Sequence, residues 1–105
     1  AFLGEMAQAL GALLAAEPEQ LVLIGGHTDN VPIQNARFDS NWELSAARAV
    51  SVSRVLVAAG LPPDRVAAAG FGDNHPRAPN HDEAARRRNR RIEVLLVPVR
   101  SVSSR

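Results

Sequence analysis

Two glycine-rich turns place polar side chains where a ligand could bind. Each turn follows a short apolar run, and each carries an aspartate: Asp29 within residues 25–30 and Asp73 within residues 70–74. In parallel α/β sheets, ligands bind at the carboxyl ends of strands, where such turns lie. A helix that begins near residue 41 would add backbone N–H donors close by. The sequence therefore predicts a polar binding site at this end of a sheet.

Arg48 is the most unusual charged residue of that predicted helix. A helical projection places it in the middle of an apolar arc formed by Leu44, Val52, Val55, Leu56 and Ala59. A buried arginine needs a paired acceptor, because an unpaired buried charge costs several kcal/mol. The pattern alone favours a plain Asp29–Arg48 ion pair, or an Arg48 that extends to water. Alternatively, Asp29 accepts from an ammonium group and Arg48 grips a carboxylate, so that the pair recognises a zwitterionic amino acid.

Catalysis and metal binding are weaker interpretations of the same residues. His27 beside Asp29 suggests a dyad, and Asp29 with Asp73 could serve as the paired carboxylates of a hydrolase. However, no nucleophile lies in a G-x-S-x-G turn. Cysteine is absent, and His27, His75 and His81 lack the spacing of zinc ligands. We expect neither a metal site nor a cofactor.

The basic run Arg86–Arg91 could bind the phosphates of a nucleic acid. Its arginines lie close to three acidic residues, Asp82, Glu83 and Glu93. The chain also contains only three Phe, one Trp and no Tyr, so it lacks a platform on which bases could stack. A formal net charge of +1 does not favour a polyanion partner for the whole chain. A solvated helix face is the simpler interpretation.

The elements that must position these residues alternate along the chain. Apolar periodicity predicts a helix over residues 2–16, and a capping signal followed by a glycine stop predicts one over residues 41–59. A charged segment with an acidic first turn predicts a short third helix over residues 82–89. Short apolar runs predict three strands, over residues 21–24, 66–71 and 92–97. This alternation predicts an α/β sandwich. Because a long helix connects the first two strands, we expect them to be parallel.

Helix ends and domain limits can also be predicted. Ser40 and Glu43 have capping-box spacing, and Gly60 suits the end of the helix that follows. With 105 residues, of which 46% are hydrophobic, the chain suits one domain. We expect that domain over residues 1–100 and a frayed tail over residues 101–105. No apolar run approaches the roughly 20 residues of a membrane helix, so we expect membrane contact only through an upstream segment.

Four motifs in order resemble the OmpA-like C-terminal domain, a family that includes OmpA, Pal and MotB. They are G-H-T-D-N at 26–30, N-W-E-L-S-x-x-R-A at 41–49, G-x-G at 70–72 and N-R-R-I-E at 89–93. The resemblance covers residues 3–98, and residues 31–33 and 38–45 look most like MotB-type members. It implies an α/β fold, an α+β sandwich, with a mixed β-sheet and helices packed on one side. The family usually has a further strand before the first helix, which we expect this sequence to lack.

The resemblance also implies non-catalytic, non-covalent binding of peptidoglycan. In family members an aspartate and an arginine hold the diaminopimelate of the stem peptide, and Asp29 and Arg48 match them. The resemblance thus favours ligand binding over the plain ion pair. The matching positions that would line the pocket are Thr28, Asn30, Asn41 and Leu44. The rim would be supported by Arg90 and Arg91.

Such a domain would anchor a membrane or envelope protein, for example a flagellar stator, to the cell wall from the periplasm. It would need no cofactor and bind no nucleic acid, and family members are often homodimers. Two alternatives stay open at this point. One is a wall hydrolase that uses Asp29, His27 and Asp73, and the other is a nucleic-acid module centred on Arg86–Arg91.

Overall fold

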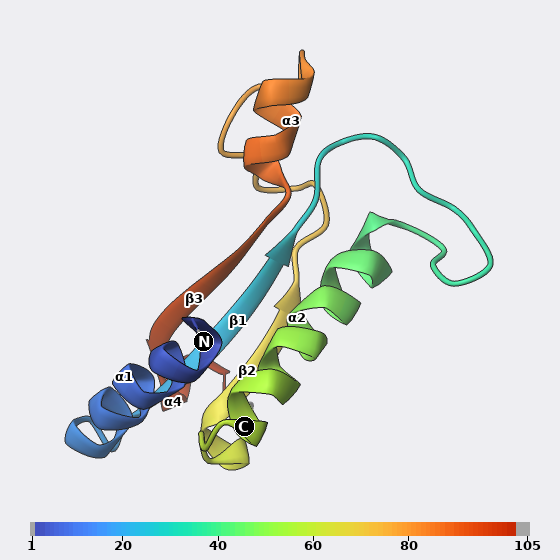
Figure 1. Cartoon of the computed structure of the whole chain (residues 1–105). Coiled ribbons are helices and arrows are strands. Elements are labelled where there is room, and N and C mark those ends of the chain that lie inside the picture. Colours follow the sequence, from blue (N-terminus) through green and yellow to red (C-terminus); the bar gives the residue numbers. More distant parts are fainter. Residues whose placement is uncertain (1, 103–105) are drawn as a thin grey trace.

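The chain folds as an alternation of helices and strands, as the apolar pattern predicted. The computed structural model describes residues 2–102 (Figure 1). The helices are α1 (Phe2–Ala16), α2 (Asn41–Ala58), α3 (Glu83–Asn89) and α4 (Val99–Val102), with a 3₁₀ turn at Pro63–Arg65. The strands are β1 (Gln20–His27), β2 (Val66–Gly70) and β3 (Arg91–Pro98).

The three strands form one mixed sheet in the order β2-β1-β3. Strand β1 pairs with β2 in parallel, which confirms the predicted direction, and with β3 antiparallel. No pattern in the sequence predicts the direction of β3. Helix α3 lies beyond the ends of the strands and covers neither face (Figure 1). The chain therefore turns back at α3 and re-enters the sheet in the opposite direction.

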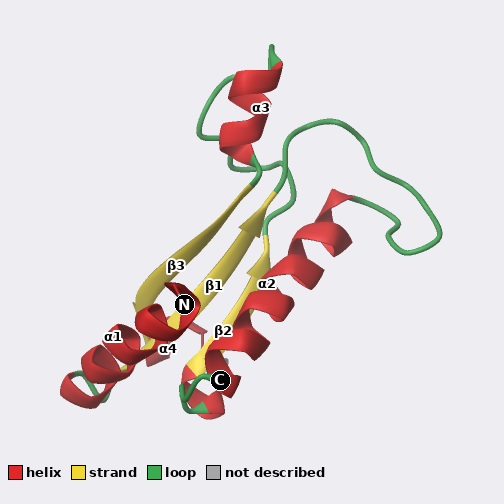
Figure 2. Ribbon diagram, in the orientation of Figure 1, coloured by secondary structure: helices red, strands yellow, loops and turns green. Residues whose placement is uncertain are grey.

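Helices α1 and α2 pack on one face of the sheet, as the family resemblance implied (Figure 2). The core between the layers contains Val22 and Ile24 of β1, Leu14 of α1 and Leu56 of α2, all buried. Each such side chain contributes about 1.5–3 kcal/mol when fully buried. This core fixes the distance between the end of β1 and the start of α2, where the polar residues lie.

Helix α2 approaches the sheet closely because two strand positions are glycine. A Cβ atom at Gly26 would collide with the backbone carbonyl of Ser45, and one at Gly70 would lie 2.6 Å from the backbone nitrogen of Ala46. The helix therefore presents its small residues to the strands, and Ser45 and Ala49 are fully buried. Any larger side chain at Gly26 or Gly70 would push the helix away from the sheet.

This close approach corrects the apolar arc that the helical projection predicted for α2. Val55, placed in the arc, is 45% exposed, and Arg48, placed in its middle, is exposed as well. Leu56, also placed in the arc, is fully buried, and Val52 packs against the core, so these two positions are confirmed.

The face that contacts the sheet is shifted from the predicted arc toward Ser45 and Ala49. The projection assumed that the large apolar side chains of α2 face the sheet. The close contacts at Gly26 and Gly70 instead leave room only for small side chains on that part of the face. Arg48 consequently lies beside the buried face and not within it.

The ends of α2 follow the predicted signals. The hydroxyl of Ser40 accepts a hydrogen bond from the backbone N–H of Trp42 at 3.1 Å and contacts the carboxylate of Glu43. The bond from Ser40 holds the pKa of Glu43 below its usual value. Beyond the helix, Gly60 has φ +123, a conformation that favours glycine.

The end of the described chain is helical. Ser101 and Val102, which we expected in a frayed tail, complete α4, and the rest of that expected tail, 103–105, lies outside the described residues. No helix within residues 2–102 has the length and apolar character needed to cross a membrane.

Candidate functional site

The segment that follows β1 holds Asp29 in a fixed position. Thr28 and Asp29 are only 4% and 7% exposed. The backbone N–H of Thr28 donates to Gly72 O at 2.8 Å, and its hydroxyl donates to Asp29 O at 2.9 Å. The Asp29 carboxylate accepts through Oδ1 from the backbone N–H of Val31 at 3.0 Å. This bond uses only Oδ1, and the second oxygen, Oδ2, binds a residue distant in sequence.

Arg90, and not Arg48, pairs with Asp29. Arg90 Nη1 lies 2.5 Å from Asp29 Oδ2, and its Nη2 lies 2.6 Å from Glu83 Oε2. The guanidinium thus bridges two carboxylates. The hydrogen bond from Arg90 holds the pKa of Glu83 below its usual value, and the bonds to Glu83 and then Asp29 raise the pKa of Arg90. The predicted Asp29–Arg48 ion pair is therefore wrong, because Arg90, the residue that caps the C-terminal end of α3, supplies a cation that the local sequence around Asp29 does not contain.

Arg48 lines the same pocket as Asp29 but keeps its charge unpaired. Among residues 2–102, no acidic side chain forms an ion pair with it, and no hydrogen bond of its guanidinium is found. The pocket, here called the Asp29 pocket, has a volume of about 350 Å³. Its lining consists of Thr28, Asp29, Val31, Pro32, Ile33, Asn41, Leu44, Arg48, Glu83 and Arg90. An unpaired cation and a buried carboxylate consequently face one hollow.

Asn41, the first residue of α2, connects the helix to the loop that follows β1. Its side-chain Nδ2 donates to Asp29 O at 3.3 Å and to Val31 O at 3.0 Å. Leu44, one turn further along α2, supplies apolar wall to the same pocket. Thr28, Asp29, Asn41, Leu44, Arg48 and Arg90 are therefore the predicted site residues that the fold brings together.

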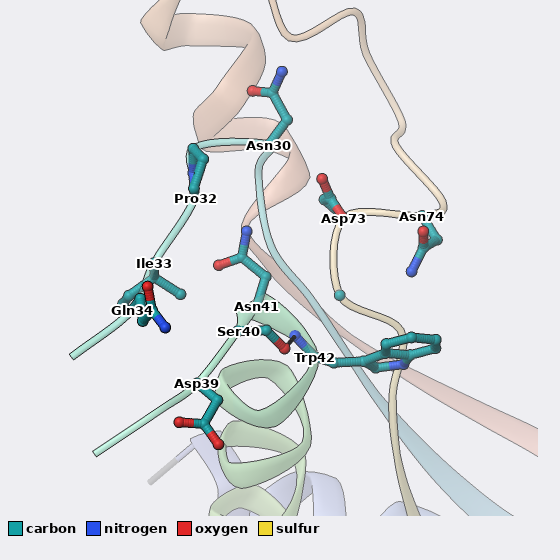
Figure 3. A pocket seen from close by; sticks show the side chains of 11 residues that line it. Asn30, Pro32, Ile33, Gln34, Asp39, Ser40, Asn41, Trp42, Asp73 and Asn74 are labelled. Carbon is teal, nitrogen blue, oxygen red and sulfur yellow. Dashed lines mark hydrogen bonds between the residues drawn. The ribbon is translucent and has the colours of Figure 1, made fainter. Parts of the chain in front are cut away.

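Asn30 lines a neighbouring pocket of about 430 Å³, which also contains Trp42, Asp39 and Asp73 (Figure 3). This Trp42 pocket shares the side chains of Pro32, Ile33 and Asn41 with the Asp29 pocket. Trp42 is 63% exposed, and its indole nitrogen donates to Gly70 O at 3.0 Å. The two aspartates considered as a hydrolytic pair, Asp29 and Asp73, thus line separate pockets.

Arg91 lies outside the Asp29 pocket and belongs to a cluster built around His27. Its Nε lies 2.7 Å from Glu93 Oε2, and its other nitrogens donate to His75 O at 2.9 Å and Asn89 O at 3.4 Å. The ring of His27 stacks on Phe71 with 4.9 Å between ring centroids. We call His27, Phe71, His75, Arg91 and Glu93 the His27 cluster.

The His27 ring is buried against this cluster. Its Nε2 lies 3.2 Å from Glu93 Oε1. Burial, followed by the charge of Arg91, lowers the pKa of His27 below 6.5, while Glu93 acts in the opposite direction. The hydrogen bond from Arg91 lowers the pKa of Glu93. The cluster therefore favours a neutral His27 beside an ionised Glu93.

Asn89 is a residue whose importance the sequence reasoning missed. It is fully buried at the end of α3. Its Oδ1 accepts from the backbone N–H groups of Arg77 and Ala78, at 2.7 and 3.0 Å. Its Nδ2 donates to Ala78 O and Asn80 Oδ1, at 2.9 and 2.8 Å. Asn89 fixes the loop before α3 and so sets the position of the two arginines that follow it. Its place directly before these arginines in the N-R-R-I-E motif was the sequence feature that could have indicated this role.

The arginines of the basic run Arg86–Arg91 have different environments. Arg90 and Arg91 bind separate carboxylates, and Arg86 lies 3.6 Å from Glu83. Arg87 and Arg88 are exposed. Among the residues that the structure describes, no group of three or more His, Cys, Asp or Glu side chains is placed to hold a metal ion.

Comparison with known proteins places the chain among its relatives. Residues 3–90 match the model of the OmpA family. The chain belongs to the OmpA family. This confirms the resemblance inferred from the four motifs.

Individual relatives show how far the similarity extends. The chain is 40% identical over 94 residues to motility protein B of Bacillus subtilis, covering 89% of this chain and 36% of that protein. It is 39% identical over 83 residues to the peptidoglycan-binding protein ArfA of Mycobacterium tuberculosis, covering 79% and 24%. The crystal structure of the C-terminal domain of Helicobacter pylori MotB superposes with a TM-score of 0.82 at 29% identity, covering 91% of this chain and 70% of that one. The chain thus spans about a third or less of these curated relatives, and the solved domain confirms the mixed α/β fold.

Proposed function

We propose that this domain binds peptidoglycan non-covalently by recognising the diaminopimelate of the stem peptide. The observation that carries the proposal is the unpaired Arg48 beside the buried Asp29 carboxylate in one pocket. A relative of the same family bears the name of a peptidoglycan-binding protein. The domain would lie in the periplasm and anchor an attached envelope protein, such as a flagellar stator, to the wall.

The charges of the Asp29 pocket suit a zwitterion. Two carboxylates, Asp29 and Glu83, face two guanidinium groups, Arg48 and Arg90, so the lining has no formal net charge. The ligand's ammonium group would bind at Asp29, beside the existing bond from Arg90. Its carboxylate would bind the planar fork of Arg48, which can donate two parallel hydrogen bonds. An ordinary amino acid within a peptide chain has no such head, whereas the distal centre of diaminopimelate does.

The arrangement supports binding without turnover. Asp29 is engaged by Arg90 and Val31, and Asp73 lines the Trp42 pocket. His27 is buried in its own cluster. The three residues weighed for a hydrolase therefore do not converge on one hollow. Residues 1–100 as the single domain, and a homodimer, stay predictions.

Co-sedimentation with diaminopimelate-containing sacculi tests the proposal. The parent protein should bind, and Arg48→Ala should reduce binding by about tenfold or more, because one charged hydrogen-bonded contact is removed. Arg54→Ala is the matched control, since it removes an exposed arginine of the same helix that does not line the Asp29 pocket. Circular dichroism verifies that each variant is folded.

Sacculi with lysine in place of diaminopimelate complete the experiment. Lysine keeps the ammonium group but lacks the second carboxylate. We expect weaker binding of the parent and no further loss in Arg48→Ala. Equal binding of the two sacculi by the parent, or an Arg48→Ala variant that binds as well as Arg54→Ala, would contradict the proposal.

A further inference from the structure

A second hollow adjoins the Asp29 pocket along helix α2. It has a volume of about 570 Å³, and its principal lining residues are Arg37, Phe38, Leu44, Arg48, Val52 and Ile92. We call it the Arg37 pocket. Leu44 and Arg48 line both pockets and form the wall between them. A ligand that reaches across this wall would occupy both hollows at once.

The Arg37 pocket is positively charged, and no acidic side chain of the described residues neutralises that charge. Its charged lining residues are two arginines, Arg37 and Arg48, and no acidic side chain lines it. Within residues 2–102 neither arginine forms an ion pair. By contrast, Arg86, Arg90 and Arg91 all lie against carboxylates. Two cations that lack acidic partners and line one hollow attract an anion.

Local contacts hold Arg37 at the pocket. Its guanidinium carbon lies 5.1 Å from the centroid of the Phe38 ring, within the range of a cation–π contact. The backbone N–H groups of Arg37 and Phe38 both donate to Asn35 Oδ1 at 2.9 Å. The pocket therefore combines a positioned cation with apolar walls from Phe38 and Val52.

The hollow on the other side of the Asp29 pocket has the opposite character. The Trp42 pocket contains two carboxylates, Asp39 and Asp73, and no cationic side chain (Figure 3). A further carboxylate would be repelled there and attracted at the Arg37 pocket. The charges of the two neighbouring pockets thus favour a bound ligand whose second carboxylate lies toward the Arg37 pocket and away from the Trp42 pocket.

We propose that the Arg37 pocket is an anion subsite that binds a second carboxylate of the stem peptide, next to the diamino acid. This inference rests on the proposed function. The apolar walls fit the short aliphatic segment that carries the carboxylate. Two sources offer this chemistry: the free α-carboxylate of the γ-linked glutamate before diaminopimelate, and the terminal carboxylate of an alanine after it.

Titration of this chain with synthetic ligands tests the subsite. The probes are diaminopimelate alone, the tripeptide γ-glutamyl-diaminopimelyl-alanine, and two forms of that tripeptide amidated at the glutamate or at the alanine carboxylate. The proteins are the parent, Arg37→Gln, and Arg54→Gln as the matched control. We expect one amidation to weaken binding to the parent by about fivefold, the loss of one exposed charged contact. The amidation that does so identifies the source.

Arg37→Gln should bind the unmodified tripeptide with about the same affinity as the parent has for the weaker-binding amidated tripeptide. In Arg37→Gln, amidation of the tripeptide should not change the affinity further. Diaminopimelate alone should bind equally to the parent and Arg37→Gln. If it binds the parent but neither amidation nor Arg37→Gln changes tripeptide affinity, the subsite is refuted and the proposed function stands. If the parent binds neither diaminopimelate nor any tripeptide, both proposals fail.

Discussion

The Asp29 pocket and the His27 cluster are built from similar parts at the same end of β1, yet they use their charges differently. Each contains one of the consecutive arginines Arg90 and Arg91 against a carboxylate. In the His27 cluster, Arg91 is only 14% exposed and donates to three protein oxygens. In the Asp29 pocket, Arg48 remains unpaired within the described chain.

This difference separates charges that stabilise the fold from charges that are available to a ligand. A buried, paired guanidinium contributes to stability because its removal leaves carbonyl and carboxylate oxygens without partners. An exposed arginine without a partner contributes little to stability. Its hydrogen-bonding capacity is available to a ligand. The comparison predicts that stability and wall binding respond to different arginines.

Asn89→Ala should have the largest effect, because Asn89 precedes both arginines and supports both regions. The substitution leaves the buried N–H and carbonyl of Ala78, and the part-buried N–H of Arg77, without their side-chain partner. We expect the free energy of unfolding to fall by about 2–4 kcal/mol. Urea denaturation measures it, with Asn74→Ala as a control at an exposed asparagine. Equal losses in both variants would mean that Asn89 does not hold the two regions.

Arg91→Ala and Arg48→Ala should give opposite results in two assays. Arg91→Ala should lower the free energy of unfolding by about 1–3 kcal/mol while the folded protein still binds sacculi. Arg48→Ala should leave the unfolding free energy within about 0.5 kcal/mol of the parent and reduce wall binding about tenfold. If Arg91→Ala abolished binding in a folded protein, the separation between the regions would be refuted.

The His27 cluster should make stability depend on pH. Burial lowers the pKa of His27 in the folded protein, so the unfolded chain takes up a proton first as the pH falls through 6.5. The stabilisation is present above that pH and is lost below it. Glu93, whose folded pKa is lowered, loses its contribution only as the pH falls below 4.5. Melting temperatures at about pH 7.5 and 5.5 should therefore differ in the parent and differ less in His27→Gln.

Arg87→Ala with Arg88→Ala should have the smallest effect. Both side chains are exposed and lie outside the Asp29 and Arg37 pockets. We expect a change in unfolding free energy within about 0.5 kcal/mol and unchanged co-sedimentation with sacculi. A marked loss of wall binding would extend the binding surface to the solvent face of α3.

Local patterns were sufficient to predict the elements, whereas contacts distant in sequence determined the details. The periodicity of α1 and the apolar runs of the strands are properties of neighbouring residues, so their positions followed from the sequence. The direction of β3 depends on α3 lying beyond the sheet, which no local pattern records. The buried face of α2 depends on contacts of Gly26 and Gly70 with a helix elsewhere in the chain.

The candidate site shows the same division. The motifs identified Asp29 and Arg48, and the fold brings them to one pocket. The partner of Asp29 is Arg90, 61 positions away in sequence, and only the tertiary structure brings them together. Arg37 was not singled out, because a lone arginine in a polar loop gives no sign of the hollow it lines.

The lengthwise placement of the sheet has a mechanical consequence. The Asp29 pocket lies just beyond the carboxyl end of β1. The C-terminal end of α1 leads into the opposite end of β1, and α4 follows β3 at that end (Figure 1). Between these ends, β1 and β3 are joined by eight residue pairs, from Gln20 with Pro98 to His27 with Arg91. Tension between a ligand at Asp29 and helix α1 would run along β1, perpendicular to these inter-strand hydrogen bonds. Both points of attachment lie on the chain segment that contains β1, so the covalent backbone of β1 would carry the load and the inter-strand bonds would not be peeled apart one at a time.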